Sequence, residues 1–119
     1  LNKDQKMMIY SQIVDLLPRT FIVAYNVKEK DFEINMEKIN SLYYSIEPFL
    51  NGQSIEKIRN DIKTFDDLCR KTMIWCKNKL TKGQQVKKED VLKDYRDQYE
   101  VISKSISDTL HQQLFNVSD

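Results

Sequence analysis

Hydrophobic residues recur every three or four positions over four stretches of the chain, and this spacing places them on one face of an α-helix. The first stretch covers residues 7–17, and Asp4 before it is a residue type that caps helix N-termini. Pro18 then removes a backbone donor, so we expect either a kink there or a new helix with Pro18 in its first turn. Residues 21–25 are apolar on every side, which fits a buried helix or a short strand. We favour a helix because no partner strand is evident elsewhere.

Two further helices are predicted in the middle of the chain. The second runs from Asp31, as its cap, to Leu50, and the Asn-Gly pair at 51–52 is expected to stop it. The third is expected to be capped by Ser54 and to end at Gly83. Its apolar positions keep a regular spacing of three and four residues, so it should bury one continuous stripe.

The fourth helix is predicted to open at Glu89 and Asp90 and to bury a stripe over residues 91–114. The steps in this stripe are mostly four residues, which suits a short globular bundle better than a long coiled coil. Short connections favour antiparallel neighbours. We therefore predict an all-α fold, an antiparallel up-down four-helix bundle, with five helices if Pro18 divides the first.

Composition supports this fold class. Among 119 residues there are only two glycines and two prolines, and a sheet protein usually spends more of both on its turns. The content of 40% hydrophobic and 31% charged residues is typical of a globular protein. We expect one domain over residues 1–119. Because the sequence begins with Leu1, it is either a processed chain or a fragment of a larger protein.

The location of the protein can be predicted from its apolar and cysteine content. The most apolar stretch, residues 7–27, is interrupted by Asp15, Pro18 and Arg19, so we predict buried core and no transmembrane segment. Cys69 and Cys76 are seven residues apart on one predicted helix, about 10 Å, which is too far for a disulfide between them. Reduced thiols favour an intracellular protein, cytoplasmic or nuclear.

Charge is distributed unevenly, although the net charge is only +1. Between positions 68 and 88 there are seven basic residues and no acidic one: Arg70, Lys71, Lys77, Lys79, Lys82, Lys87 and Lys88. Without local counter-charge, these would form a positive lobe able to hold an acidic protein partner, or the phosphates of nucleic acid or acidic lipid. The alternative is a solvated helix end, where lysines interact favourably with the helix dipole or meet the acidic residues of the last helix.

Aromatic residues give two further candidates for partner binding. Trp75, the only tryptophan, lies at the edge of the third stripe, where it is either a binding anchor or a core residue. Tyr43 and Tyr44 are adjacent and cannot both face the core, so one of them is expected at the surface. We predict that Tyr44 lines a groove for a partner helix or is simply an exposed helix-edge residue.

The sequence contains no recognisable catalytic or metal-binding pattern. His111 is the only histidine, which rules out a zinc site built on several histidines. Cys69 and Cys76 fall on an apolar stripe, where thiols are inert. The acidic residues of the last helix are spread around several of its sides and are expected to be solvated. We therefore predict a protein that is not an enzyme and that has no cofactor or metal.

Two helical modules share features with the second half of the chain. It resembles the rapamycin-binding four-helix module of TOR kinases at Gly52, Trp75, Cys76, Lys77, Gly83, Leu92 and Tyr95. It is similar to the C-terminal bundle of an ESCRT subunit at Arg70, Trp75, Val86, Val91 and Tyr95. Because two unrelated bundles fit equally well, the resemblance implies helical packing, and it assigns no functional residue.

These observations predict a non-enzymatic helical interaction module, acting as a subunit, adaptor or regulatory domain of a larger assembly. One alternative is binding of nucleic acid or acidic phospholipid through residues 70–88. Another is a small inhibitor or regulator from a virus or mobile element. The predicted partner is a protein, either acidic or a helical peptide. The candidate partner-binding residues are Arg70, Lys71, Trp75, Lys77, Lys79, Lys82, Lys87, Lys88 and Tyr44.

Overall fold

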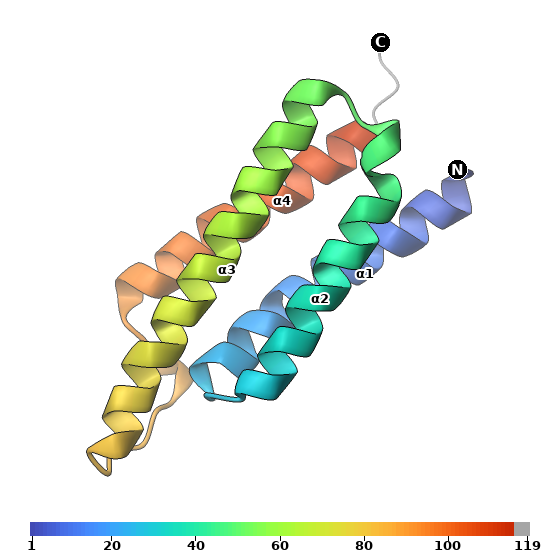
Figure 1. The fold of residues 1–119 in the computed structure, drawn as a ribbon. Coiled ribbons are helices and arrows are strands. Elements are labelled where there is room, and N and C mark those ends of the chain that lie inside the picture. Colours follow the sequence, from blue (N-terminus) through green and yellow to red (C-terminus); the bar gives the residue numbers. More distant parts are fainter. Residues whose placement is uncertain (116–119) are drawn as a thin grey trace.

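Long helices account for most of the computed structural model, which describes residues 1–115 except the side chain of Lys88 (Figure 1). The elements are α1 (Lys3–Tyr25), α2 (Glu29–Ile46), the 3₁₀ turn η1 (Glu47–Phe49), α3 (Gly52–Thr81), the 3₁₀ turn η2 (Lys88–Asp90) and α4 (Lys93–Phe115). Within the described residues there is no β-strand. The all-α prediction is therefore confirmed.

Each helix runs antiparallel to the one before it, as the colours in Figure 1 show. α1 packs against all three other helices, and α3 packs against α4. The backbones of α2 and α3 lie farther apart, and long side chains span the distance between them. This arrangement confirms the predicted up-down four-helix bundle, which is elongated, with extents of 54 × 24 × 20 Å.

Pro18 lies inside α1, and the helix continues through it. The predicted alternative of five helices is therefore wrong. Pro18 has no N–H to donate to the carbonyl of Val14. Because Pro18 is exposed, its ring and this carbonyl face away from the centre of the bundle. Two residues later, the buried Thr20 hydroxyl donates to the carbonyl of Leu16 at 2.6 Å. Residues 21–25 form the last turns of the same helix, as we favoured, and Phe21 is buried there.

Helix starts differ from the predicted ones by a few residues, because the predicted capping side chains are not the ones that cap these helices. Asn2, rather than Asp4, caps α1, and it forms a reciprocal capping box with Gln5. α2 begins at Glu29 without a side-chain cap, so Asp31 lies within its first turn. An acidic residue there still interacts favourably with the positive end of the helix.

The boundary between α2 and α3 also differs from the prediction. Asn51 caps α3 by accepting from the backbone of Ser54 at 2.9 Å, so Ser54 is not the cap. Gly52 begins α3 and does not end α2. α2 instead tightens into η1, which contains Pro48. At the other end of the chain, Glu89 and Asp90 belong to η2, because α4 starts only at Lys93.

Two helices end in the same hydrogen-bonded motif. After α3, Gly83 has a φ of 75°, and the amides of Gly83 and Gln84 donate to the carbonyls of Leu80 and Lys79, as in a Schellman motif. The end of α3 near Gly83 is therefore confirmed. After α1, the equivalent position is Val27, with a φ of 57°. A β-branched residue in this left-handed conformation is strained, and Val27 packs against the core.

The predicted apolar stripes meet in one core. Its largest fully buried side chains come from all four helices and the connection before α4: Tyr43, Phe32, Phe65, Ile13, Leu17, Ile39, Ile46, Ile58, Ile106, Leu110 and Val91. Within residues 1–115, α1 is long and apolar enough to cross a membrane by length and composition, a test that core helices also pass. The absence of a transmembrane segment therefore stays a prediction.

Candidate functional surfaces

Two cations of the basic segment are neutralised by α2. Arg70 forms ion pairs with Glu33 at 2.7 Å and with Asp66 at 2.8 Å, and its guanidinium lies over the Phe32 ring. Lys77 pairs with Glu29 at 3.1 Å. The expectation that this segment lacks local counter-charge is therefore wrong for Arg70 and Lys77. Glu33 and Glu29 come from α2, whereas Asp66 is on α3 itself, so the pairs with Glu33 and Glu29 help to connect the two separated helices.

Four other residues of the basic segment form a stripe along a different flank of α3. We call Lys71, Trp75, Lys79 and Lys82 the basic stripe. Lys79 Nζ lies 4.4 Å from the centre of the Trp75 ring, and Tyr95 of α4 meets this ring edge-on at 6.4 Å. Trp75 is half-buried and packs against the core, as its predicted role of core residue requires. Its alternative role as a binding anchor stays a prediction.

The remaining candidates are separate from the basic stripe. Lys87 is exposed in the connection before η2, and the side chain of Lys88 lies outside the part that the structure describes. Tyr43 is buried and Tyr44 is 58% exposed, so one of the two tyrosines is at the surface, as predicted. Tyr44 lines a small groove between α2 and α3, together with Arg59 and residues on both helices. The structure thus places the predicted partner-binding residues of α3 on two flanks of that helix, and it places Lys87 in the following connection and Tyr44 on α2.

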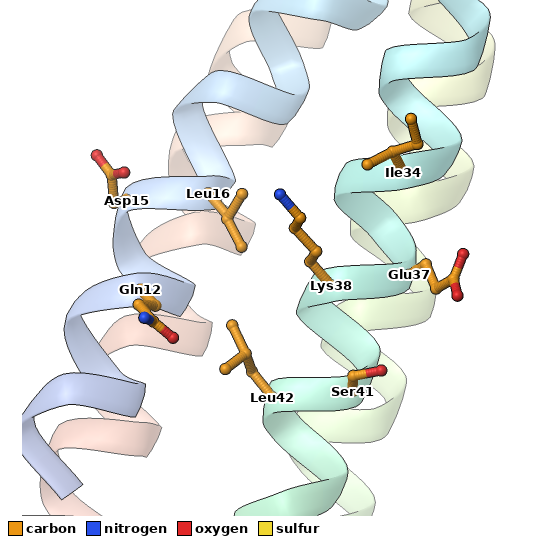
Figure 2. A pocket seen from close by; sticks show the side chains of 8 residues that line it. All are labelled: Gln12, Asp15, Leu16, Ile34, Glu37, Lys38, Ser41 and Leu42. Atoms are coloured by element: carbon orange, nitrogen blue, oxygen red, sulfur yellow. The ribbon is translucent and has the colours of Figure 1, made fainter. Parts of the chain in front are cut away.

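A groove with a volume of about 640 Å³ lies between α1 and α2 (Figure 2). Its lining residues are Gln12, Asp15, Leu16, Ile34, Glu37, Lys38, Ser41 and Leu42. Leu16 and Leu42 point toward one another across the groove, and the Lys38 side chain extends from α2 into the space beside Leu16 and above Leu42. Leu16 and Leu42 form the apolar floor of the groove. Two acidic side chains and one basic side chain border this floor, so the groove carries little net charge.

Exposed apolar side chains continue beyond the ends of this groove. On α1, Met8 and Ile22 are separated from the groove residue Asp15 by seven positions on either side, which places them on the same helix face. Met8 is 55% exposed, Ile22 is 43% exposed, and Ile34 inside the groove is 42% exposed. We call these three residues, with Leu16 and Leu42, the α1–α2 face.

The groups most able to perform chemistry are sequestered. Cys69 and Cys76 are free and buried, so no disulfide joins them. Burial raises the pKa of the Cys76 thiol to about 11 and raises that of Cys69 further. Both thiols therefore stay protonated at neutral pH. His111 is exposed and packs edge-on against Tyr10. Within the described residues, no cluster of His, Cys, Asp and Glu could hold a metal ion.

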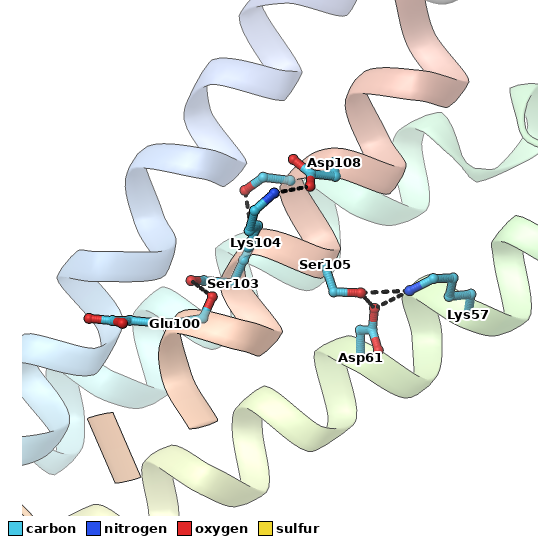
Figure 3. Close-up of polar contacts among 8 residues, drawn as sticks. Lys57, Asp61, Glu100, Ser103, Lys104, Ser105 and Asp108 are labelled. Atoms are coloured by element: carbon cyan, nitrogen blue, oxygen red, sulfur yellow. Dashed lines mark hydrogen bonds and ion pairs between the residues drawn. The ribbon is translucent and has the colours of Figure 1, made fainter. Parts of the chain in front are cut away.

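A polar cluster joins α3 to α4 (Figure 3). The Ser105 hydroxyl donates to Asp61 at 2.6 Å, and Lys57 Nζ donates to both Ser105 at 2.6 Å and Asp61 at 3.1 Å. Because the ammonium group donates to the serine, it is not placed as a base that would activate it. The cluster fixes the separation of the two helices. The sequence analysis missed it, although Lys57 and Asp61 have the four-residue spacing of a helical ion pair.

Comparison of the chain with protein-family models, with curated proteins and with solved structures gives no match. The function has to be argued from the surfaces described above. The sequence analysis overlooked the α1–α2 face, yet a signal was present. Met8, Ile22 and Ile34 are apolar residues that fall off the buried stripes of their helices, and such residues are candidates for an exposed contact surface.

Proposed function

We propose that this protein is a non-enzymatic helical interaction module that binds an amphipathic helix of a partner protein on the α1–α2 face. The observation that carries the proposal is the open groove between α1 and α2, whose apolar floor is extended by exposed apolar residues. Grooves between two helices, with an apolar floor and polar borders, are a common way to bind an amphipathic helix.

The dimensions of the face support a helical ligand. Met8 and Ile22 are fourteen residues apart on α1, which corresponds to about 21 Å along the helix. A bound helix of about four turns would cover that length and present apolar residues at each turn. Leu16 and Leu42 would form the centre of the contact, with Gln12, Glu37 and Lys38 at its border.

A site-specific photocrosslinking experiment tests this proposal. A photoreactive amino acid replaces Ser41, an exposed residue that lines the groove, and the control carries it at Val101, which is 67% exposed on α4. In an extract of cells that naturally express the protein, we expect a discrete adduct from position 41 and none from position 101. Ile34→Asp should remove the adduct because it places a charge in the apolar contact.

Three outcomes would contradict the proposal. These are no adduct at position 41, equal adducts at both positions, or an adduct that survives Ile34→Asp. A second substitution, Val101→Asp, introduces the same charge at an exposed apolar position outside the face. It should leave the adduct at position 41 intact, which separates loss of the contact from a general effect of the added carboxylate.

A further inference from the structure

We propose that the basic stripe is a second binding surface, independent of the α1–α2 face, and that it binds an acidic segment of another protein. Lys71 and Lys82 are exposed, and their spacings of four and seven residues from Trp75 place all three on one face of α3. Lys79 completes the stripe through its contact with the Trp75 ring.

The lysines of the stripe keep their charge uncompensated. Arg70 and Lys77, on the neighbouring flank of α3, form ion pairs with α2. Among the described residues, none of Lys71, Lys79 and Lys82 forms an ion pair with a carboxylate, since the ion pairs of α3 involve other residues. Three uncompensated cations around one indole give a surface that favours a negatively charged ligand.

Carboxylates of η2 and of the first turns of α4 contact other groups. Asp90 accepts a hydrogen bond from the backbone of Lys87 at 3.1 Å. Asp94 accepts from Gln98 at 2.8 Å, and Asp97 pairs with Lys93 at 3.7 Å. The acidic residues of the last helix therefore do not neutralise the stripe through direct contacts.

The geometry favours a protein segment over a nucleic acid. Lys79 already lies over the Trp75 ring, so a base could stack there only by displacing it. Outside residues 68–88 the chain is acidic on balance, and nucleic-acid modules are usually basic as a whole. Lys71 and Lys82 are eleven residues apart, or about 16 Å along α3. Carboxylates at that separation, with an apolar residue between them to contact Trp75, would match the stripe.

Trp75 provides the measurement, because it is the only tryptophan of the chain. The full chain is titrated at low salt with a synthetic glutamate-rich peptide that carries one central leucine, and the fluorescence of Trp75 is followed. We expect a saturable change in emission. Replacing Lys71→Gln and Lys82→Gln together should weaken binding by roughly tenfold, which is the effect expected from losing two exposed ion pairs.

The matched control is the double variant Lys3→Gln and Lys30→Gln, which removes the same charge at exposed positions on α1 and α2 and should bind as the unmodified chain does.

A single-stranded oligothymidylate and phosphatidylserine vesicles are titrated in parallel. The proposal is overturned if the peptide gives no saturable change, if both double variants weaken binding equally, or if either comparison ligand binds more tightly than the peptide. None of these results bears on Ile34 and the α1–α2 face, so the two proposals fail separately.

Discussion

Replacing Pro18 by alanine should stabilise the protein. Proline inside a helix lacks the N–H that would donate to the carbonyl four residues earlier, here that of Val14, and it costs about 3 kcal/mol relative to alanine. Pro18 is well inside α1, which continues to Tyr25. Its side chain is exposed, so the substitution leaves no cavity in the core.

The expected gain is smaller than the full helix penalty. Alanine makes the unfolded chain more flexible, which offsets about 0.4–1 kcal/mol. The proline ring also faces solvent, where the local distortion of α1 is partly relieved by hydration. We therefore expect the free energy of unfolding to rise by about 1–2.5 kcal/mol. For 119 residues, the average unfolding entropy per residue converts each kcal/mol into about 4 °C, so Tm should rise by about 4–10 °C.

Urea unfolding followed by helical circular dichroism measures the change, and Pro48→Ala is the control. Pro48 lies in the first turn of η1, where a missing N–H breaks no helical hydrogen bond. Alanine there should be neutral or slightly destabilising. The reasoning is refuted if Pro18→Ala leaves the urea midpoint unchanged or lowers it, or if Pro48→Ala raises it by the same amount.

Two further predictions concern charged residues. Arg59 Nε donates to Glu47 at 2.8 Å, and this hydrogen bond lowers the pKa of Glu47 below its ordinary 4.5. The stabilisation is therefore present above about pH 4.5 and is lost as the pH falls through the lower pKa of Glu47 in the folded protein. Between about pH 6 and pH 3, the urea midpoint should drop more steeply for the unmodified chain than for Arg59→Gln. Parallel pH profiles of the two proteins would contradict this prediction. Among the residues that the structure describes, Arg96 Nε is buried and has no hydrogen-bond partner. Arg96→Met should raise the free energy of unfolding by up to about 1 kcal/mol, because it keeps the packed stem and removes the unpaired donor. A lower urea midpoint would show that Arg96 has a stabilising role.

Helix number, helix order and most of the buried positions could be predicted because they depend on a spacing that is local in sequence. The exact helix starts could not, because adjacent polar residues compete as caps. Asn2 and Asp4 both have side chains that cap helices well. The reciprocal hydrogen bond between Asn2 and Gln5 favours Asn2, but it forms only when the first turn of the helix has formed. Asn51 similarly caps α3 although the following glycine resembled the end of α2.

The candidate surfaces were harder to predict because they depend on contacts between distant residues. The ion pair between Lys77 and Glu29 joins residues 48 positions apart, and no pattern in the sequence indicates it. The charge count therefore overestimated how many cations of the basic segment remain available. For Tyr44, the adjacent Tyr43 was enough to show that one of the two lies at the surface. Which groove Tyr44 lines could not be predicted, because the groove depends on how α2 and α3 are arranged.

The strained turn after α1 has a consequence for attempts to isolate α1 and α2, the two helices of the proposed binding face. Val27 holds a left-handed conformation that costs roughly 1–2 kcal/mol for such a residue, and its packing against the core and the backbone hydrogen bonds of the turn offset that cost. A peptide that contains only α1 and α2 would lack the core residues that α3 and α4 supply, so we expect the turn at Val27 to be held less firmly in it. We therefore expect Leu16 and Leu42 to be held opposite one another less firmly in that peptide than in the 119-residue chain, which is the form to use in a test of the proposed contact.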